Sequence, residues 1–332
     1  MSPARTHPGR PITALPLLPV EERAVLEASF RQLLPRPAAT ERHLAGVLAD
    51  TLGNPGSLAR AQLAFGVMEE LEVPAQPARE LAIAVEYFHT ASLLFDDLPA
   101  MDDARERRGR PCPHVTYGEA AAMLGGLALI TGAYQLLWRV LAAASGEVRD
   151  GAGALVAECL GTRGVLQGQA LDLHFATAPR AERSPEGEAA AVERVALGKT
   201  VPLVRLALVL PALVGGAAAA EIELLERVSH AWGLAYQGLD DARDLLLQPA
   251  ETGKSTARDA LLGRPNLAST LGGPATVARL KAWLSEGRRL VEELAALRSG
   301  WRRLEGLQIH LEDELAALAP RLSAAITEAQ AA

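Results

Sequence analysis

Two groups of aspartate residues, far apart in the chain, have the types and spacing for metal-assisted chemistry. Residues 96–103 read DDLPAMDD and residues 237–244 read QGLDDARD. Two carboxylates about 4 Å apart repel each other by roughly 4 kcal/mol at an effective dielectric constant of 20, so each group needs a positive partner. Oxygen ligands without cysteine or clustered histidine favour a hard ion, and Mg²⁺ commonly bridges carboxylates to substrate phosphates. The predicted metal ligands are Asp96, Asp97, Asp102, Asp240, Asp241 and Asp244.

Basic residues between and after these clusters have the chemistry to bind an anion. Only three of the 33 basic residues are lysine, and two of those three fall in this region. Pro202 removes a backbone donor, so it predicts a helix kink that presents Lys199 and Thr200 to a cavity. Lys254 and Arg264 follow the second cluster and are predicted to close over the same anion. The alternative is that Lys199 only reaches out from the core and that the other two are surface residues.

The first cluster is predicted to lie at the end of an apolar helix over residues 77–97. Pro99 disfavours a straight continuation of that helix, and the macrodipole already disfavours anions at a helix C-terminus. His89, Ser92 and Asp96 are three or four residues apart, so they form one polar stripe on this helix. The alternative is a solvated acidic loop beside arginine residues.

The second cluster is predicted to be a polar face of a helix over residues 221–246. Gln237 and the three aspartates after it fall at positions i, i+3, i+4 and i+7, which share one face. Gly233, one turn earlier, is expected to leave space for something to pass. The two clusters are roughly 140 residues apart, and we expect them to face each other across one cavity that holds metal ions.

Composition predicts that helices carry these residues. Apolar residues make up 49% of the chain and aromatic residues only 4%, which favours helices packed on helices. The Pro-rich residues 1–20 are predicted to be a flexible arm, and residues 21–332 a single domain. Two long polar connections, 176–187 and 247–266, are typical of lids or ligand clamps. Helical periodicity is found at 21–34, 40–52, 58–72, 77–97, 117–144, 152–175, 188–215, 221–246, 275–296 and 300–330.

Charge and cysteine content exclude several classes of protein. A formal charge of −7 and a pI near 5.6 provide no basic field for a nucleic acid. Cys112 and Cys159 have no neighbours typical of metal or nucleophile sites, so we interpret both as ordinary thiols. No signal peptide is evident, which predicts a cytoplasmic protein. The uncharged segment 120–138 contains several glycines, so we predict a buried central helix without stable membrane insertion.

These motifs together resemble the polyprenyl synthetase family of trans-isoprenyl diphosphate synthases. DDLPAMDD followed by RRGRP is similar to the family's first aspartate-rich motif in the bacterial form with two extra residues. GQALDL, GKT, YQGLDDARD, TGK and GRPN follow in the family's order, over roughly residues 56–270. The resemblance implies an all-α orthogonal helical bundle around a deep central cavity, usually a homodimer. It also implies a prenyltransferase that condenses isopentenyl diphosphate with an allylic diphosphate.

The resemblance assigns roles to individual residues on the allylic side. A cluster of about three Mg²⁺ ions, held by the aspartates named above, would bind the allylic diphosphate and assist its ionisation. Basic residues would hold the same diphosphate, and two polar residues would stabilise the allylic cation. The basic residues are Arg107, Lys199, Lys254 and Arg264, and the polar residues are Thr200 and Gln237.

On the side of isopentenyl diphosphate the sequence departs from the family. Arg60, His89 and Arg108 match positions that bind this diphosphate, but Ser57 stands where the family usually has a lysine. A charge-assisted phosphate contact is typically worth about 1.5–3 kcal/mol, so the missing charge is significant. One alternative is therefore a terpene synthase-like enzyme that ionises a prenyl diphosphate without isopentenyl diphosphate. A second is a non-catalytic regulatory subunit of a prenyltransferase.

Small residues before the first cluster bear on product length. In short-chain bacterial relatives an aromatic plug is common five residues before the first aspartate, where this chain has Ala91 next to Ser92. Phe88 lies about 12 Å deeper along the helix at 1.5 Å per residue, and it is the predicted floor of the product tunnel. We predict a C20 product, geranylgeranyl diphosphate, with C15 and C25 as the neighbouring lengths.

Overall fold

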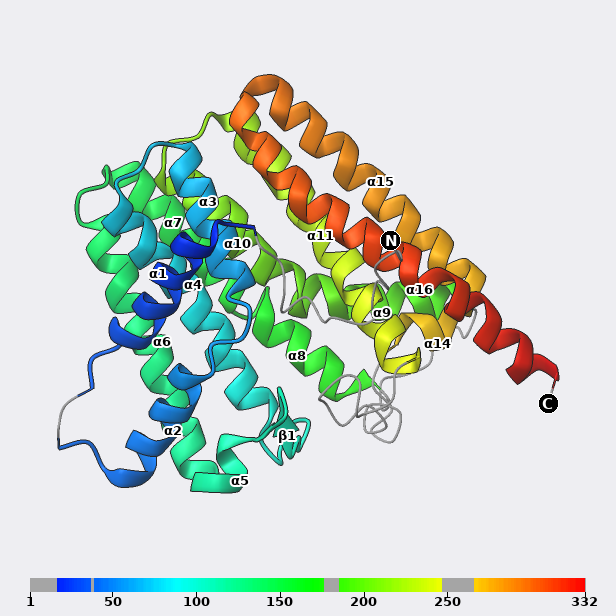
Figure 1. The fold of residues 1–332 in the computed structure, drawn as a ribbon, viewed down its shortest axis with the longest axis horizontal. Helices are drawn as coiled ribbons and strands as arrows, with labels where there is room; N and C mark the ends of the chain where they lie inside the picture. The colour runs from blue at the N-terminus through cyan, green and yellow to red at the C-terminus, as the bar shows by residue number, and fades with distance from the viewer. Residues whose placement is uncertain (1–16, 37–38, 176–184, 247–265, 332) are drawn as a thin grey trace, which may run out of the picture.

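A computed structural model describes residues 17–36, 39–175, 185–246 and 266–331. The described part of the chain is almost entirely helical, so the predicted all-α class is confirmed (Figure 1). The first half contains α1 (Val20–Gln32), α2 (Arg42–Gly53), α3 (Ala59–Glu70), α4 (Ala75–Asp96), α5 (Pro113–Tyr117), α6 (Glu119–Leu141) and α7 (Gly146–Leu160). The second half contains α8 (Val165–Leu173), α9 (Pro185–Lys199), α10 (Val201–Val214), α11 (Ala219–Leu246), α14 (Leu267–Leu271), α15 (Gly273–Leu297), the 3₁₀ helix η3 (Ser299–Leu304) and α16 (Glu305–Ala331).

Helix α4, which leads to the first cluster, is surrounded by α3, α6 and α10. Its side chains are buried nearly all round from Ala78 to Leu94. Close packing against α6 depends on small residues. A Cβ atom on Gly126 would lie 2.8 Å from the Phe95 ring, and one on Gly125 would clash with Val47 of α2. The end of α4 is therefore fixed by the core.

Helix α6 itself differs from the predicted buried central helix. By length and composition α6 could span a membrane, and so could the bent pair of α9 and α10 taken together. Of the apolar window of α6, 44% is buried inside the structure. One face packs on α4, while Leu124, Leu127 and Trp138 are exposed on the other. The glycines of α6 that predicted a buried central helix lie on its packed face, where they allow close contact with neighbouring side chains.

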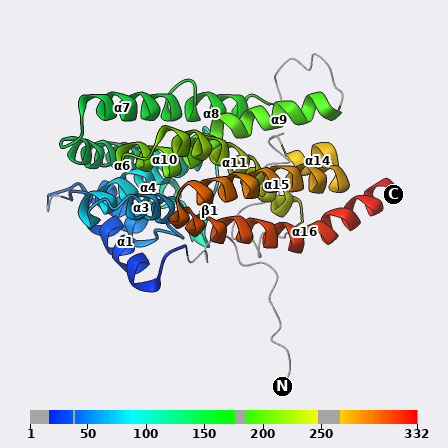
Figure 2. The ribbon, with the colours of Figure 1, turned by 90° about the horizontal axis from the view of Figure 1, so that it is seen from above.

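Two predicted helices are divided in the structure. The segment predicted as one helix over residues 152–175 is α7 and α8, because the chain breaks at Gly161 to Gly164. The predicted kink before Pro202 is confirmed, since α9 and α10 meet at Thr200 with a bend of 41°. Figure 2 shows α7, α8 and α9 following one another along one side of the molecule.

A short β-hairpin between α4 and α5 was not predicted. Strand β1 (Glu106–Arg107) pairs with β2 (Arg110–Pro111). The two residues between them, Arg108 and Gly109, have φ angles of 56° and 71°, which suits a tight two-residue hairpin turn. The hairpin directs two neighbouring arginines, Arg107 and Arg108, back toward α4.

The second cluster belongs to a bundle of long helices. Helix α15 packs against α11 and α16, and the three run side by side in both views (Figures 1 and 2). Trp232 of α11 donates a hydrogen bond of 2.7 Å to Gln308 of α16 in the buried interior. Residues 1–16 of the predicted arm and most of both predicted loops lie outside the described residues.

Candidate active site

The first aspartate cluster lies where α4 ends, as predicted. The last helical residue is Asp96 and the C-cap is Asp97. The chain then turns back, because the amide of Asp102 donates to the carbonyl of Asp96 at 2.9 Å. Asp103 has a left-handed backbone with φ of 46°, which aspartate tolerates better than most residues. The turn thus brings Asp102 next to the end of α4.

Asp97 is paired with Arg107 of the hairpin. The carboxylate is 3% exposed, and the guanidinium approaches it at 2.7 Å through Nη2 and at 2.8 and 3.0 Å through Nε. Burial alone would lower the pKa of Arg107, but the charge of Asp97 raises it above its ordinary value. The predicted phosphate-binding arginine therefore neutralises a predicted metal ligand in this arrangement of the chain.

Lys199 contacts both Asp96 and Asp172. The Lys199 ammonium is 2.6 Å from Oδ2 of Asp172 and 4.0 Å from Oδ2 of Asp96. Burial raises the pKa of Asp96 to about 6, although the charge of Lys199 works in the opposite direction. Asp172, on the polar face of the GQALD segment, was not among the predicted site residues. Asp172 lies three residues after Gln169, so both share one helix face, and this spacing could have identified Asp172 as a site residue.

A close helix contact places Lys199. A Cβ atom on Gly168 of α8 would lie 2.2 Å from the backbone nitrogen of Lys199, and one on Gly198 would lie 2.6 Å from Cα of Gly168. The two helices can approach this closely only because both positions are glycine. The contact fixes the end of α9 next to Asp172.

The second cluster is tied to the same helix junction. Oγ1 of Thr200 donates to Oε1 of Gln237 at 2.6 Å, and Nε2 of Gln237 donates to Oδ1 of Asp241 at 2.9 Å. The other Asp241 oxygen accepts from the backbone N–H of Leu267 at 2.7 Å. Burial raises the pKa of Asp241 to about 7. Gly233 leaves no passage, because a Cβ there would meet Val201, so it serves the contact between α10 and α11.

The two clusters are thus connected through the junction of α9 and α10. Lys199 reaches Asp96 and Asp172, and the next residue, Thr200, reaches Asp241 through Gln237. Helices α4, α8, α9 and α11 all contribute residues to this chain of contacts. Both clusters are therefore linked to one helix junction, and a shared cavity that holds metal ions between them stays a prediction.

Asp240 has an arginine partner from its own helix. Nη1 of Arg243 lies 2.7 Å from Oδ1 of Asp240, and Nε of Arg243 pairs with Glu314 of α16. The sequence DDARD contains this arginine, but its role depends on the position of α16, which the sequence pattern does not give. Asp244 lies one turn beyond Asp240 on α11.

A separate group of basic side chains, Arg60, His89 and Arg108, lies before the first cluster. The charges of Arg60 of α3 and Arg108 of the hairpin act on both His89 of α4 and buried Glu86, whose Oε2 accepts from the Ala61 amide at 2.9 Å. Burial, followed by the charges of the arginines, lowers the pKa of His89 well below its ordinary value. Nε of Arg60 and Nδ1 of His89 are buried and have no hydrogen-bond partner among the described residues. The group is therefore prepared for an anionic ligand.

Ser57 lies beside this group. Its carbonyl accepts from Gln62 at 2.7 Å, next to Gly56, which has φ of 70°. A Cβ on Gly56 would lie 2.4 Å from Cζ of Arg108, so the glycine allows the guanidinium to lie close to this loop. Arg108 also donates to the carbonyl of Asn54 at 3.1 Å.

The three predicted chain-length residues lie on the buried side of α4. Ala91 is 1% exposed, and Ser92 donates to the carbonyl of His89 at 2.8 Å. Phe88 is 4% exposed and stacks edge to face with Tyr134 of α6 at a centroid distance of 5.0 Å. The tunnel floor stays a prediction, and Tyr134 is a further residue at that position.

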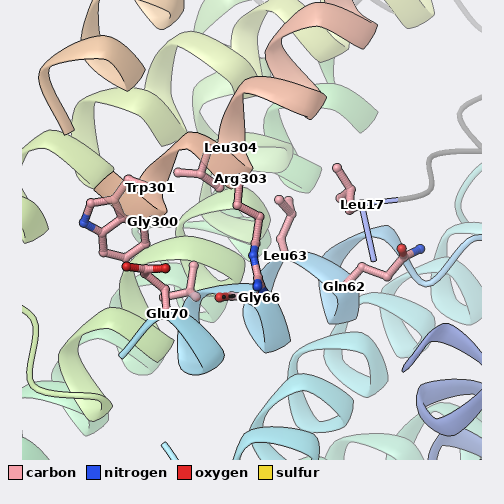
Figure 3. Close-up of a pocket in the computed structure, with 10 residues that line it drawn as sticks. Leu17, Gln62, Leu63, Gly66, Glu70, Gly300, Trp301, Arg303 and Leu304 are labelled. Carbon is pink, nitrogen blue, oxygen red and sulfur yellow. Dashed lines mark hydrogen bonds between the residues drawn. The ribbon is translucent and has the colours of Figure 1, made fainter. Parts of the chain in front are cut away.

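Two predicted site residues, Lys254 and Arg264, lie outside the described residues. A surface hollow elsewhere is lined by α3 and η3, with Leu63, Trp301, Arg303 and Leu304 around it (Figure 3). None of the predicted site residues lines this hollow. We therefore assign the candidate site to the aspartate clusters.

The donor set fits divalent magnesium. In the part of the chain that the structure describes, no three acidic, histidine or cysteine side chains already converge on one point. The cationic side chains of Lys199, Arg107 and Arg243 instead contact the carboxylates. All candidate donors are carboxylate oxygens, which suit a hard ion. The six aspartates predicted from the sequence stay the predicted ligands, with Asp97 paired with Arg107 and Asp241 bonded to Gln237 and the Leu267 amide in this structure.

An all-helical bundle with two connected aspartate clusters defines an isoprenoid synthase fold, and comparison with known proteins supports this assignment. A model of the family described as polyprenyl synthetase matches residues 41–295. The chain therefore belongs to the polyprenyl synthetase family, and the predicted family and prenyltransferase class are confirmed.

Individual relatives agree. The chain is 34% identical over 243 residues to geranylgeranyl pyrophosphate synthase 3, chloroplastic, of Arabidopsis thaliana, covering 72% of this chain and 64% of that protein. It is 36% identical over 201 residues to the heterodimeric geranylgeranyl pyrophosphate synthase large subunit 2 of Arabidopsis thaliana, covering 60% and 51%. It thus spans about half to two thirds of these relatives. A solved geranyltransferase from Helicobacter pylori, complexed with magnesium and isoprenyl diphosphate, is 24% identical with a TM-score of 0.74, covering 89% and 95%.

Proposed function

We propose that the chain condenses isopentenyl diphosphate with an allylic diphosphate. The observation that carries this proposal is a pair of anion sites close together along α4. One lies at its end, where Asp96 meets Lys199, and the other consists of Arg60, His89 and Arg108. An enzyme that only ionises one prenyl diphosphate needs a single such site. A condensing enzyme needs two.

The residues suggest how the reaction proceeds. The C1–O bond of the allylic diphosphate breaks, the double bond of isopentenyl diphosphate forms the new C–C bond, and the departing diphosphate takes the final proton. Bound Mg²⁺ would neutralise the diphosphate as that bond breaks. Lys199 binds the same anion as a compact charge. The Thr200 hydroxyl donates a hydrogen bond to Gln237, so the lone pairs of its oxygen are available to face the allylic cation.

We propose a C20 product, in line with the relatives named geranylgeranyl pyrophosphate synthases. Ala91 is small and buried, without the aromatic plug of short-chain relatives, and the Phe88 and Tyr134 pair supplies an aromatic floor. Ala91→Tyr should shorten the main product by at least one C5 unit, measured by mass spectrometry of the dephosphorylated alcohols. Unchanged product length would place the floor elsewhere.

The test of the activity is product analysis with Mg²⁺ and C5, C10 or C15 primers, with and without isopentenyl diphosphate. Extended products only with both substrates are expected. A cyclised or hydrolysed product from the primer alone would favour the terpene synthase-like alternative. That alternative arises because Ser57 stands where the family usually has a lysine. Turnover only after addition of a second protein would favour the regulatory subunit. Ser57→Lys should lower the Michaelis constant for isopentenyl diphosphate if that position faces the substrate.

We also propose that two copies meet through α6. Met123, Leu124, Leu127 and Trp138 form an exposed stripe on one face of this helix. An apolar face of this length is typical of a protein interface. Trp138→Arg should convert a dimer to a monomer in light scattering, whereas liposome binding by the wild-type chain would favour a membrane contact. A cytoplasmic location also stays a proposal.

A further inference from the structure

Arg243 divides its guanidinium group between two carboxylates on different helices. Nη1 is 2.7 Å from Asp240 of the second cluster, and Nε pairs with Glu314 of α16. All three side chains are largely buried, with exposed fractions of 13% for Arg243, 23% for Asp240 and 14% for Glu314. The predicted metal ligand and the C-terminal helix thus share one cation.

The pair of Arg243 and Glu314 is only half formed. Nη2 of Arg243 and Oε2 of Glu314 are both buried and have no hydrogen-bond partner within the described ranges. Nε and Nη2 form one edge of the guanidinium, which can bind a carboxylate through two parallel hydrogen bonds. The atoms that would make the second bond are the two that lack partners.

Other arginines in the same chain form the complete pair. Arg205 binds Glu226 through Nε at 2.5 Å and through Nη2 at 2.8 Å. Arg288 binds Glu312 through the same two nitrogens. Neither of these arginines contacts a residue of the aspartate clusters in the interactions described here. Arg205 also binds Glu158 through Nη1 at 3.1 Å while it keeps its complete pair with Glu226, so contact with a third carboxylate does not by itself open such a pair. Arg243 differs from both arginines because its Nη2 and the second oxygen of Glu314 are buried without hydrogen-bond partners among the described residues.

We propose that Arg243 is a positioning residue that holds Asp240 while no divalent ion is bound and moves fully onto Glu314 when the ion binds. The inference rests on the proposed function, in which the second cluster binds Mg²⁺ with a diphosphate. Ion binding withdraws Asp240 from Nη1, and the guanidinium then completes its two-bond pair with Glu314. Arg243 competes with the ion for Asp240. Glu314 makes displacement of Arg243 less unfavourable, because it pairs with the guanidinium that has left Asp240.

Substitutions of Arg243 and of Glu314 are expected to have opposite effects on ion binding. Arg243→Gln removes the competing charge, so Mg²⁺ should bind more tightly, by about fivefold or more. Glu314→Gln removes the second carboxylate, so an arginine displaced from Asp240 would be buried without a charge partner. Mg²⁺ should then bind more weakly, by about fivefold or more. A purely structural role predicts lower stability in both variants with no such opposition.

The experiment is calorimetric titration of the full chain with MgCl₂ in the presence of inorganic pyrophosphate, which needs no turnover. Thermal unfolding with and without the same additives checks that each variant is folded. Arg243→Gln combined with Glu314→Gln should regain stability relative to Arg243→Gln alone and keep the tighter binding. Arg243→Lys should bind Mg²⁺ no more tightly than wild type, because an ammonium keeps the charge but cannot form the two-bond pair. Arg288→Gln is the matched control and should change stability only.

Opposite shifts in the two single variants support the proposal. Shifts in the same direction, or no shift in either, would overturn it even if the wild-type chain binds Mg²⁺ with pyrophosphate. A wild-type chain that binds neither would instead remove the proposed function. If Arg243→Gln does not fold, Glu314→Gln still decides, because unchanged or tighter Mg²⁺ binding in that variant would contradict the proposal.

Discussion

The first aspartate cluster lies at a helix end and in the turn that follows, whereas the second lies inside the unbroken helix α11. The first is held by side chains from elsewhere, since Arg107 comes from the hairpin and Lys199 from α9. In the second, Gln237 and Arg243 reach the aspartates from three or four residues away on the same helix. Tertiary contacts thus build the first cluster, and helical spacing builds most of the second.

This difference has a consequence for stability. A carboxylate held by a distant arginine, such as Asp97, loses its partner completely when the arginine is removed. An aspartate on α11 keeps its neighbours as long as the helix persists. We therefore expect substitutions around the first cluster to affect both folding and activity, and those around the second to affect mainly ion binding.

The largest effect is expected for Asp96→Asn. Loss of a charged metal ligand at the meeting point of both clusters should reduce kcat by about a thousandfold. Initial rates of incorporation of labelled isopentenyl diphosphate provide the measurement. Asp103→Asn in the same turn is the matched control, because asparagine also tolerates the left-handed backbone there. Equal losses of kcat in both variants would mean that catalysis depends on the total negative charge of this turn and not on Asp96 in particular.

The next effect is expected for Arg107→Leu in the metal-free protein. It leaves Asp97 buried at 3% exposure without its cation, which should lower the free energy of unfolding by about 3 kcal/mol. Urea unfolding in EDTA gives this value. Arg110→Leu, at an exposed position of the same hairpin, should change it by less than about 0.5 kcal/mol. A stable Arg107→Leu variant would show that the pair does not hold the first cluster together.

Lys199→Ala tests the connection between the clusters. Removing the cation beside Asp96 and Asp172 should lower kcat/KM for the allylic substrate by about a hundredfold, and Lys199→Arg should recover only part of it. Lys281→Ala, an exposed lysine on α15, is the control. If Lys199→Ala retained full activity, the clusters would have to function without this bridge.

The smallest effect is a change in the pH dependence of stability without metal. Burial raises the pKa of Asp241 to about 7, so the folded chain binds more protons than the unfolded chain between about pH 4 and 7. Stability from this group is therefore lost as pH rises through that window. Asp241→Asn should gain a few degrees in melting temperature over wild type between pH 5 and pH 8. Scanning calorimetry in EDTA checks it, with exposed Asp313→Asn as the control, and parallel curves would contradict it.

Spacing alone predicted much of the second cluster. Residues at i, i+3, i+4 and i+7 share a face of any α-helix, so Gln237 and the aspartates after it were found without knowledge of the fold. Pro202 likewise predicted the bend at Thr200, because a missing amide is a local property. Gly233 was misjudged, since whether a glycine leaves space or admits a neighbour depends on the helix opposite.

The sequence by itself determined the helical class, the end of α4 at the first aspartates and the residues able to bind metal, because these follow from local periodicity and side-chain chemistry. Only the tertiary structure decided which cation contacts which carboxylate. The contacts of Arg107 with Asp97, Lys199 with Asp172 and Arg243 with Glu314 join residues 10, 27 and 71 positions apart. Such pairs depend on how helices pack, and packing is set by the whole core rather than by any single motif.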